Sequence, residues 1–97
     1  MIYETDGRYF EWDEIKAMIN EVKHGVRFEK AAKVFFDEYK IIRRDKKHSK
    51  TEERYNVIGM AEDVLFVVYT ERRENTRIIS ARLANDIERR LYYGDSA

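Results

Sequence analysis

Arginine side chains near the ends of two strand-like segments are the residues in this sequence best suited to chemistry. Arg72 closes one such segment, while Arg77 and Arg82 bracket Ile-Ile-Ser-Ala in the next one. The planar guanidinium group matches the geometry of phosphate oxygens. Cleavage of RNA by attack of a 2′-hydroxyl on the adjacent phosphate needs such cations around the developing negative charge. These arginines therefore indicate a phosphate-binding site.

The spacing of Arg77 and Arg82 limits how the two residues can act together. Side chains alternate between the two faces of a strand, so a separation of five residues places them on opposite faces unless a β-bulge intervenes. The alternative interpretation is structural, because charged residues at strand ends are usually solvated or paired. The acids that we then expect as partners are Glu53, Glu71 and Glu88.

His48 is a candidate for proton transfer, because an imidazole titrates near neutral pH. It lies in the basic segment Lys46-Lys47-His48-Ser49, where a solvated histidine without a catalytic role is the alternative. The other histidine, His24, precedes Gly25 at the expected end of a helix, where a positive charge interacts favourably with the helix dipole. Two histidines without a cysteine do not make a closed zinc site, so we expect neither a metal nor a cofactor.

The composition indicates one small folded domain. The 97 residues contain 43% hydrophobic and 39% charged side chains, with no proline and no cysteine, which argues against a disordered tail and excludes a disulfide scaffold. The longest apolar run, residues 64–69, is too short for a membrane helix, and the N-terminus does not resemble a signal peptide. We therefore expect residues 1–97 to form a single soluble, cytoplasmic domain.

Charge is unevenly distributed along the chain, although 19 basic and 19 acidic residues give a net charge of zero. Residues 1–38 contain six basic and nine acidic side chains, a net of −3, whereas residues 39–54 contain seven basic and three acidic ones, a net of +4. A balanced chain would ordinarily argue against a polyanionic partner. The basic segment keeps such a partner open.

Hydrophobic periodicity predicts two helices in the first half of the chain. In the first, apolar residues recur at positions 15, 18, 19 and 22, with Asp13 as the N-cap and Gly25 as the residue that ends the helix. The same spacing continues in a second helix, which begins close to Val26, at Phe28, Ala31, Ala32 and Phe35. Before both helices, Asp6-Gly7 separates two aromatic-rich segments and indicates a short hairpin.

Side-chain alternation with a period of two predicts strands in the second half. The four strands are expected at residues 39–44, 54–60, 64–70 and 76–82. The connections after the second and third strands are of hairpin length, which makes the strands antiparallel. Residues 45–53 are almost entirely polar and indicate an exposed loop.

A final helix follows the strands, because Asn85 and Glu88 form a capping-box pattern and Gly94 follows the last apolar position. The sequence thus predicts an α+β fold. It consists of two N-terminal helices, a four-stranded antiparallel sheet and a C-terminal helix, with the helices packed on one face of the sheet.

Several short segments, taken in order, carry a resemblance to a known family. They are Phe10-Glu11-Trp12-Asp13, Asn20, Lys23-His24-Gly25-Val26, Phe28-Glu29, His48-Ser49, Glu52-Glu53-Arg54, Ile58-Gly59, Tyr69-Thr70-Glu71-Arg72, Arg77-Ile78-Ile79-Ser80-Ala81-Arg82, Ala84, Glu88-Arg89-Arg90 and Tyr92. Together they resemble the BrnT toxins of type II toxin–antitoxin systems. Residues 1–9 extend beyond the usual start of that family, and Ala61-Glu62-Asp63 stands where a glycine-containing turn is more usual.

This resemblance implies a RelE-like fold and metal-independent RNA cleavage, which inhibits translation and arrests growth. It also implies neutralisation by a BrnA-like antitoxin that carries a ribbon-helix-helix DNA-binding part. The implied assembly is a heterotetramer of two toxins and two antitoxins, which binds operator DNA only through the antitoxin.

The resemblance and the basic strand ends together give a hypothesis for the site. The residues expected to bind and stabilise the phosphate are Arg77, Arg82, Arg72 and Arg54. His48 or Glu53 would then move protons. The alternative function is a non-cleaving subunit that binds the antitoxin and assists repression of the operon. Balanced charge and the lack of an obvious acid–base pair favour this alternative.

Overall fold

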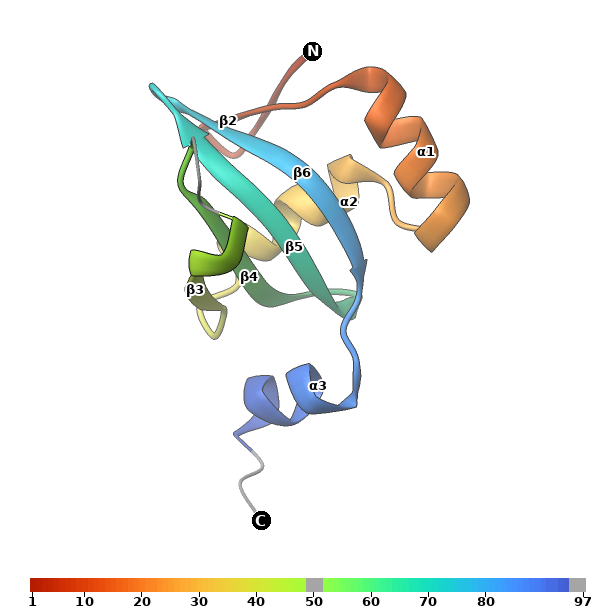
Figure 1. The fold of residues 1–97 in the computed structure, drawn as a ribbon, viewed down its shortest axis with the longest axis vertical. Coiled ribbons are helices and arrows are strands. Elements are labelled where there is room, and N and C mark those ends of the chain that lie inside the picture. The colour runs from red at the N-terminus through yellow and green to blue at the C-terminus, as the bar shows by residue number, and fades with distance from the viewer. Residues whose placement is uncertain (49–51, 95–97) are drawn as a thin grey trace.

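The structure is a computed structural model that describes residues 1–48 and 52–94, apart from the side chain of His48. In this part of the chain, helices pack against a six-stranded sheet (Figure 1). The elements in chain order are β1 (Ile2–Thr5), β2 (Arg8–Glu11), α1 (Glu14–His24), α2 (Phe28–Ala32), the 3-10 helix η1 (Lys33–Phe36), β3 (Ile41–Asp45), the 3-10 helix η2 (Lys46–His48), β4 (Arg54–Ala61), β5 (Asp63–Arg72), β6 (Asn75–Leu83) and α3 (Asp86–Tyr93). None of the described helices is long and apolar enough to cross a membrane.

The predicted architecture of two N-terminal helices and a four-stranded antiparallel sheet is wrong. The four predicted strands are present, but β1 and β2 precede the helices and join the sheet, whose order is β1-β2-β6-β5-β4-β3. β2 pairs with β6 in parallel, with Phe10 opposite Thr76 and Glu11 opposite Arg77, so the sheet is mixed. Periodicity is a local signal and does not report a pairing between segments so far apart in sequence. The RelE-like arrangement that the resemblance implies is not supported either, because the β1–β2 hairpin extends the sheet to six strands.

The N-terminal hairpin confirms what the turn residues indicate. β1 and β2 are antiparallel, and the turn between them consists of Asp6 and Gly7. Both residues have a positive φ, 51° and 82°, as the two central residues of a type I′ hairpin turn require. The hairpin brings Phe10 into the core and Glu11 to the edge of β6.

The core lies on one face of the sheet, which α2 and η1 cover. Figure 1 shows α2 behind β5 and β6, and Phe28, Val34 and Phe35 from this layer are almost completely buried. The sheet and the helical layer approach closely at Gly59 of β4. A Cβ atom at this position would lie 2.9 Å from the Cβ of Val34, so the packing requires glycine.

Helix α1 begins and ends where the sequence predicts. The side chain of Asp13 accepts hydrogen bonds from the backbone N–H groups of residues 15 and 16, and Gly25 ends the helix with a φ of 71°. The residue through which α1 docks is Asn20, which is 6% exposed. Its amide donates to the carbonyl oxygens of Val26 and Ala81, and its oxygen accepts from the Ala81 N–H. The apolar positions that predict the helix face solvent instead.

Helix α3 lies beyond the end of the sheet in Figure 1 and is attached by polar contacts. The predicted capping box is present between Asn85 and Glu88. Glu88 also accepts two hydrogen bonds from Arg82 of β6, at 2.8 and 2.9 Å. At the other end of the helix, the Tyr92 hydroxyl donates to Asp37 at 2.5 Å. These contacts hold α3 against the sheet.

Candidate active site

A β-bulge in β6 decides which of the predicted arginines share a face. The register between β5 and β6 shifts at Val68 and Tyr69, which leaves Ile79 as the extra residue in β6. Because the bulge resets the alternation of side chains, Arg77 and Arg82 lie on the same face of the sheet. This is the face opposite the core, in front of β5 and β6 in Figure 1.

Arg77 and Arg82 nevertheless lie at different places on this face. Five residues at about 3.3 Å each separate them along β6, roughly 16 Å in all. Arg77 donates to Glu11 of β2 at 2.7 Å, whereas Arg82 is bound to Glu88 of α3 and lies over the ring of Phe66. The expectation that the two arginines hold one phosphate has no support in this arrangement.

A cavity of about 440 Å³ lies next to the Arg77–Glu11 pair. Its lining residues are Glu11, Glu52, Arg72, Arg73 and Asn75. They come from three segments that are distant in sequence: β2, the residues before β4, and the β5–β6 hairpin. This convergence of acids and arginines makes the cavity the candidate site.

The two acids of the cavity are ionised at neutral pH. A hydrogen bond from Asn75 at 3.1 Å is the main cause that lowers the pKa of Glu11, and the bond from Arg77 adds to it against the opposing effect of burial. The pKa of Glu52 is lowered chiefly by its hydrogen bond from Arg72 at 2.8 Å. Both carboxylates are therefore proton acceptors rather than proton donors.

The backbone around the cavity is held in place by further contacts. The hydroxyl of Thr70 donates to the backbone oxygen of Glu53 at 2.6 Å, which fixes the segment that carries Glu52 against β5. In the turn of the β5–β6 hairpin, Arg73 adopts a φ of 56°, a left-handed conformation that costs energy for a residue other than glycine. Asp6 and Glu62 adopt the same conformation in the other two hairpin turns, so it is a feature of the turns and not a mark of the site.

The other predicted site residues are dispersed. Arg54 begins β4 opposite Asp45, and its charge contributes to the low pKa of Glu52. Glu53 does not line the cavity; it is exposed and accepts hydrogen bonds from Arg44 and from the hydroxyl of Tyr55. The side chain of His48 lies outside the described part of the structure, so its predicted role stays a prediction.

Sequence reasoning missed three residues of the candidate site. Glu52 stands in the segment Glu52-Glu53-Arg54 that carries the family resemblance but is not among the predicted site residues, and neither is Asn75. Glu11 lies in the segment Phe10-Glu11-Trp12-Asp13, which carries the family resemblance but predicts no role for this residue. That segment was the signal in the sequence from which Glu11 could have been found. The parallel pairing of β2 with β6 is what gives Glu11 its partner.

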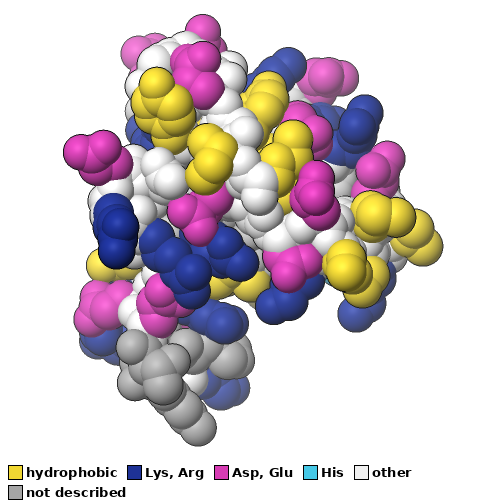
Figure 2. Space-filling model, turned by 90° about the horizontal axis from the view of Figure 1, so that it is seen from above, with side chains coloured by type: hydrophobic (Ala, Val, Ile, Leu, Met, Phe, Trp, Pro, Cys, Tyr) yellow, Lys and Arg dark blue, Asp and Glu magenta, His cyan; other side chains and the backbone are white. Residues whose placement is uncertain are grey.

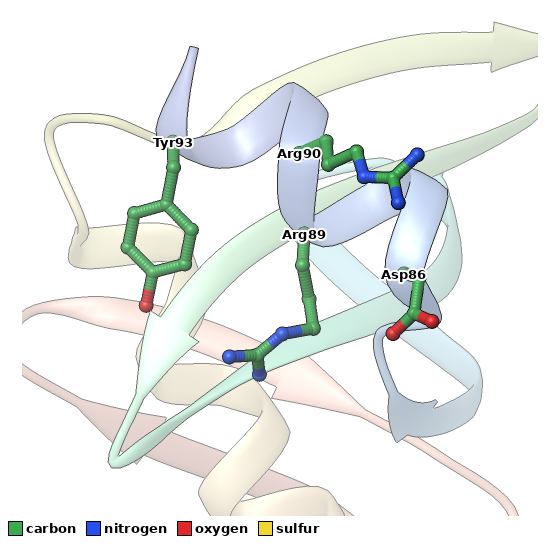
Figure 3. Close-up of a pocket in the computed structure, with 4 residues that line it drawn as sticks. All are labelled: Asp86, Arg89, Arg90 and Tyr93. Carbon is green, nitrogen blue, oxygen red and sulfur yellow. The ribbon is translucent and has the colours of Figure 1, made fainter. Parts of the chain in front are cut away.

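A second cavity, of about 250 Å³, is shown in Figure 3 and lies on α3. Its lining residues are Asp86, Arg89, Arg90 and Tyr93, which all belong to this one helix. Arg89 and Tyr93 lie along the same side of the helix, with the guanidinium 6.0 Å from the centre of the ring. Since no other element contributes a wall, this cavity is a shallow depression on the surface of the helix and not a candidate site. Among the described residues, no three acidic or histidine side chains converge so that they could hold a metal ion.

Comparison with known proteins places the chain in a family. A family model described as "Ribonuclease toxin, BrnT, of type II toxin-antitoxin system" matches residues 12–88, which is most of the chain. The chain belongs to the BrnT toxin family. The crystal structure of the Brucella abortus ribonuclease toxin BrnT has the same fold, with a TM-score of 0.61 and 23% sequence identity over 79% of this chain and 96% of that one. No curated protein matches the sequence.

Membership of the BrnT family confirms the resemblance that the sequence carries. Because the family consists of ribonuclease toxins from type II systems, an antitoxin partner follows from it. The matched residues of this BrnT-family chain include Glu52, Arg72 and Arg77, and they begin directly after Glu11. The family assignment thus covers most of the candidate site.

Proposed function

We propose that this BrnT-family chain is an endoribonuclease whose active site is the cavity beside Glu11 and Arg77. The observation that carries the proposal is the 2.7 Å contact between an ionised carboxylate and a guanidinium, with Arg72 on the same cavity. Glu11 takes the proton from a 2′-hydroxyl as that oxygen attacks the adjacent phosphate. Arg77 and Arg72 stabilise the negative charge that develops on the phosphate oxygens.

The bonds and protons of this step assign a role to each group. The new bond joins the 2′-oxygen to phosphorus, and the bond from phosphorus to the 5′-oxygen breaks, which leaves a cyclic phosphate and a 5′-hydroxyl. When Glu11 becomes protonated it loses its charge, and Arg77 is released to bind the phosphate instead. The 5′-oxygen needs a proton, for which His48 is the candidate from the sequence. No metal ion is needed for any of these steps.

The proposal includes the effect of RNA cleavage on the cell and the protein that neutralises the toxin. RNA cleavage would inhibit translation and arrest growth in the cytoplasm. The antitoxin would be a BrnA-like protein with a ribbon-helix-helix part, joined with the toxin in a heterotetramer of two copies each. Operator DNA would be bound through the antitoxin alone.

The test is cleavage of labelled RNA by the purified chain in excess chelator. We expect Glu11→Gln to lower the cleavage rate by about 10²- to 10⁴-fold, because the general base is lost. Arg77→Ala should lower it by about 10²- to 10³-fold, because the developing charge loses a cation. Arg82→Gln, which keeps a donor for Glu88, should cleave at nearly the unmodified rate. Circular dichroism verifies that each variant is folded.

Other results would contradict parts of the proposal. A folded Glu11→Gln variant with full activity would show that the site is misplaced. Activity that appears only after a divalent metal is added would remove the metal-free mechanism. RNA that is bound but left intact would favour the non-cleaving subunit. The pairing of Arg77, Arg72 and Arg82 with acids, which reduces their attraction for phosphate, is the observation in favour of that alternative.

A further inference from the structure

Helix α1 carries its apolar face on the outside of the molecule. Ile15, Met18, Ile19 and Val22 are exposed by 70%, 68%, 58% and 90%. Successive residues of a helix are 100° apart, so these four positions form one stripe over two turns. The opposite side of the helix docks through Asn20. An amphipathic helix ordinarily buries its stripe, so this one lacks a partner within the described part of the chain.

The two borders of this stripe differ in charge. On one side, between α1 and β6, a groove of about 210 Å³ is bordered by Lys16, Lys23 and His24. On the other side, a groove of about 480 Å³ is bordered by Glu14, Glu21 and Glu29, together with Arg27, which pairs with Glu21 at 3.7 Å. In Figure 2, hydrophobic side chains stand between charged ones on the right, the side on which α1 lies.

We propose that the stripe of α1 is the docking site for an amphipathic helix of the antitoxin. The apolar face of that helix would cover Met18 and its neighbours, as in two-helix packing with a stripe of this spacing. The flanks of the docked helix carry acidic side chains toward Lys16 and Lys23, and basic ones toward Glu14 and Glu21. The inference rests on the proposed function only in taking an antitoxin as the partner.

Charge disfavours one other occupant of the stripe, a second copy of the chain whose α1 packs antiparallel to the first. Two copies of α1 that pack antiparallel about a two-fold axis place like flanks together, lysine against lysine and glutamate against glutamate. Like charges at such positions are repulsive. A partner with its own sequence can present the complementary flank at both borders, and an acidic border also disfavours RNA.

The experiment measures binding of the protein encoded by the adjacent reading frame to the purified chain by calorimetry. Met18→Glu should weaken binding by at least about 30-fold, the size of a hot-spot substitution. The matched control is Ile87→Glu on α3, since Ile87 and Met18 are both 68% exposed. The control should bind within about 3-fold of the unmodified chain, because its side chain lies away from the stripe.

Charge reversal on the basic border gives a second measurement. Lys16→Glu with Lys23→Glu should weaken binding strongly at low salt and less at high salt, because exposed charges are screened. Equal binding by the Met18→Glu variant and the unmodified chain would overturn the proposal. So would no binding by the unmodified chain, an equal loss in the Ile87→Glu control, or a dimer of the free chain that Met18→Glu dissociates in sedimentation.

Cleavage of RNA by the same variants separates this inference from the proposed activity. Met18→Glu and Ile87→Glu both leave the cavity beside Glu11 unchanged, so each should cleave like the unmodified chain. The binding of the partner protein is measured by calorimetry and does not depend on RNA cleavage. A chain that binds its partner through α1 but does not cleave RNA would therefore support the docking site and contradict only the ribonuclease proposal.

Discussion

At the scale of single residues, two pairs of opposite charges lie on the face of the sheet opposite the core. Arg77 with Glu11, and Arg82 with Glu88, place an arginine of β6 against an acid from another element. The two pairs differ in their surroundings. Glu11 borders the cavity of about 440 Å³, whereas Glu88 is 7% exposed and is held by the capping box as well. The first pair is suited to chemistry and the second to stability.

The Glu88 pair predicts a stability that depends on pH. Burial by itself raises the pKa of Glu88, but hydrogen bonds from Arg82 and from the Asn85 backbone outweigh it and keep the pKa below 4.5. The unfolded chain then binds the proton more readily, so the stabilisation is complete above pH 4.5 and is lost as the pH falls through the folded pKa. Glu88→Gln keeps an acceptor for the cap but has no charge.

Urea unfolding of the unmodified chain and of the Glu88→Gln variant measures the contribution of the Glu88 charge to stability. The free energy of unfolding should fall on substitution at pH 7, and the difference between the two proteins should shrink below pH 4.5. In an Arg82→Gln background the dependence on pH should become smaller, because the main favourable partner is absent. A difference that stays constant from pH 7 to pH 3 would contradict this explanation.

At the scale of elements, one amide determines how α1 meets the sheet. Asn20 makes three hydrogen bonds to backbone groups of residues 26 and 81, and these groups are buried. The amide ties the helix to the loop that follows it and to β6. Because α1 docks through a polar residue, its apolar stripe remains available on the outer side.

Replacement of this amide should weaken the docking of α1. Asn20→Ala leaves buried backbone groups without partners, and we expect a loss of about 2–4 kcal/mol in the free energy of unfolding. Glu21→Ala, at the next position, should change it by less than about 0.5 kcal/mol, since the pair of Glu21 with Arg27 is exposed. Denaturant unfolding of the three proteins gives the comparison. Equal stability of the Asn20→Ala and Glu21→Ala variants would show that the amide is not the anchor.

At the scale of the whole molecule, α3 differs from the layers around the sheet. Figure 1 shows it beyond the strands, and its attachment includes the Arg82–Glu88 pair and the Tyr92–Asp37 hydrogen bond. Burial and the neighbouring carboxylate raise the pKa of Tyr92 to about 12, so its hydroxyl remains a donor at neutral pH. Regions with few buried apolar contacts open independently of the core.

This arrangement predicts separate opening of α3. In a Glu88→Gln, Tyr92→Phe variant, hydrogen exchange of the α3 amides should become faster, while the amides of β4, β5 and β6 stay protected. Tyr93→Phe, at a position that is 57% exposed, is the control and should leave both rates unchanged. Faster exchange in the helix and the sheet to the same extent would show instead that α3 unfolds only together with the core.

Local signals in the sequence determined much of this protein. Asp13, Gly25 and the Asn85–Glu88 box predicted the helix ends correctly, because a cap depends on residues within one turn of it. Alternation likewise predicted each of the four later strands to within two residues at either end. Family membership was also readable, since it depends on the order and spacing of many short segments.

Only the tertiary structure decided what these elements do together. The parallel pairing of β2 with β6 gives Arg77 its partner Glu11. The bulge at Ile79 places Arg77 and Arg82 on the same face of the sheet. Neither feature leaves a periodic signal in the sequence. The same periodicity that correctly predicted α1 did not tell which side of it is buried, because a stripe shows that a helix is amphipathic but not which molecule covers it. Pairing over long distances in sequence is settled by packing, and packing involves the whole chain.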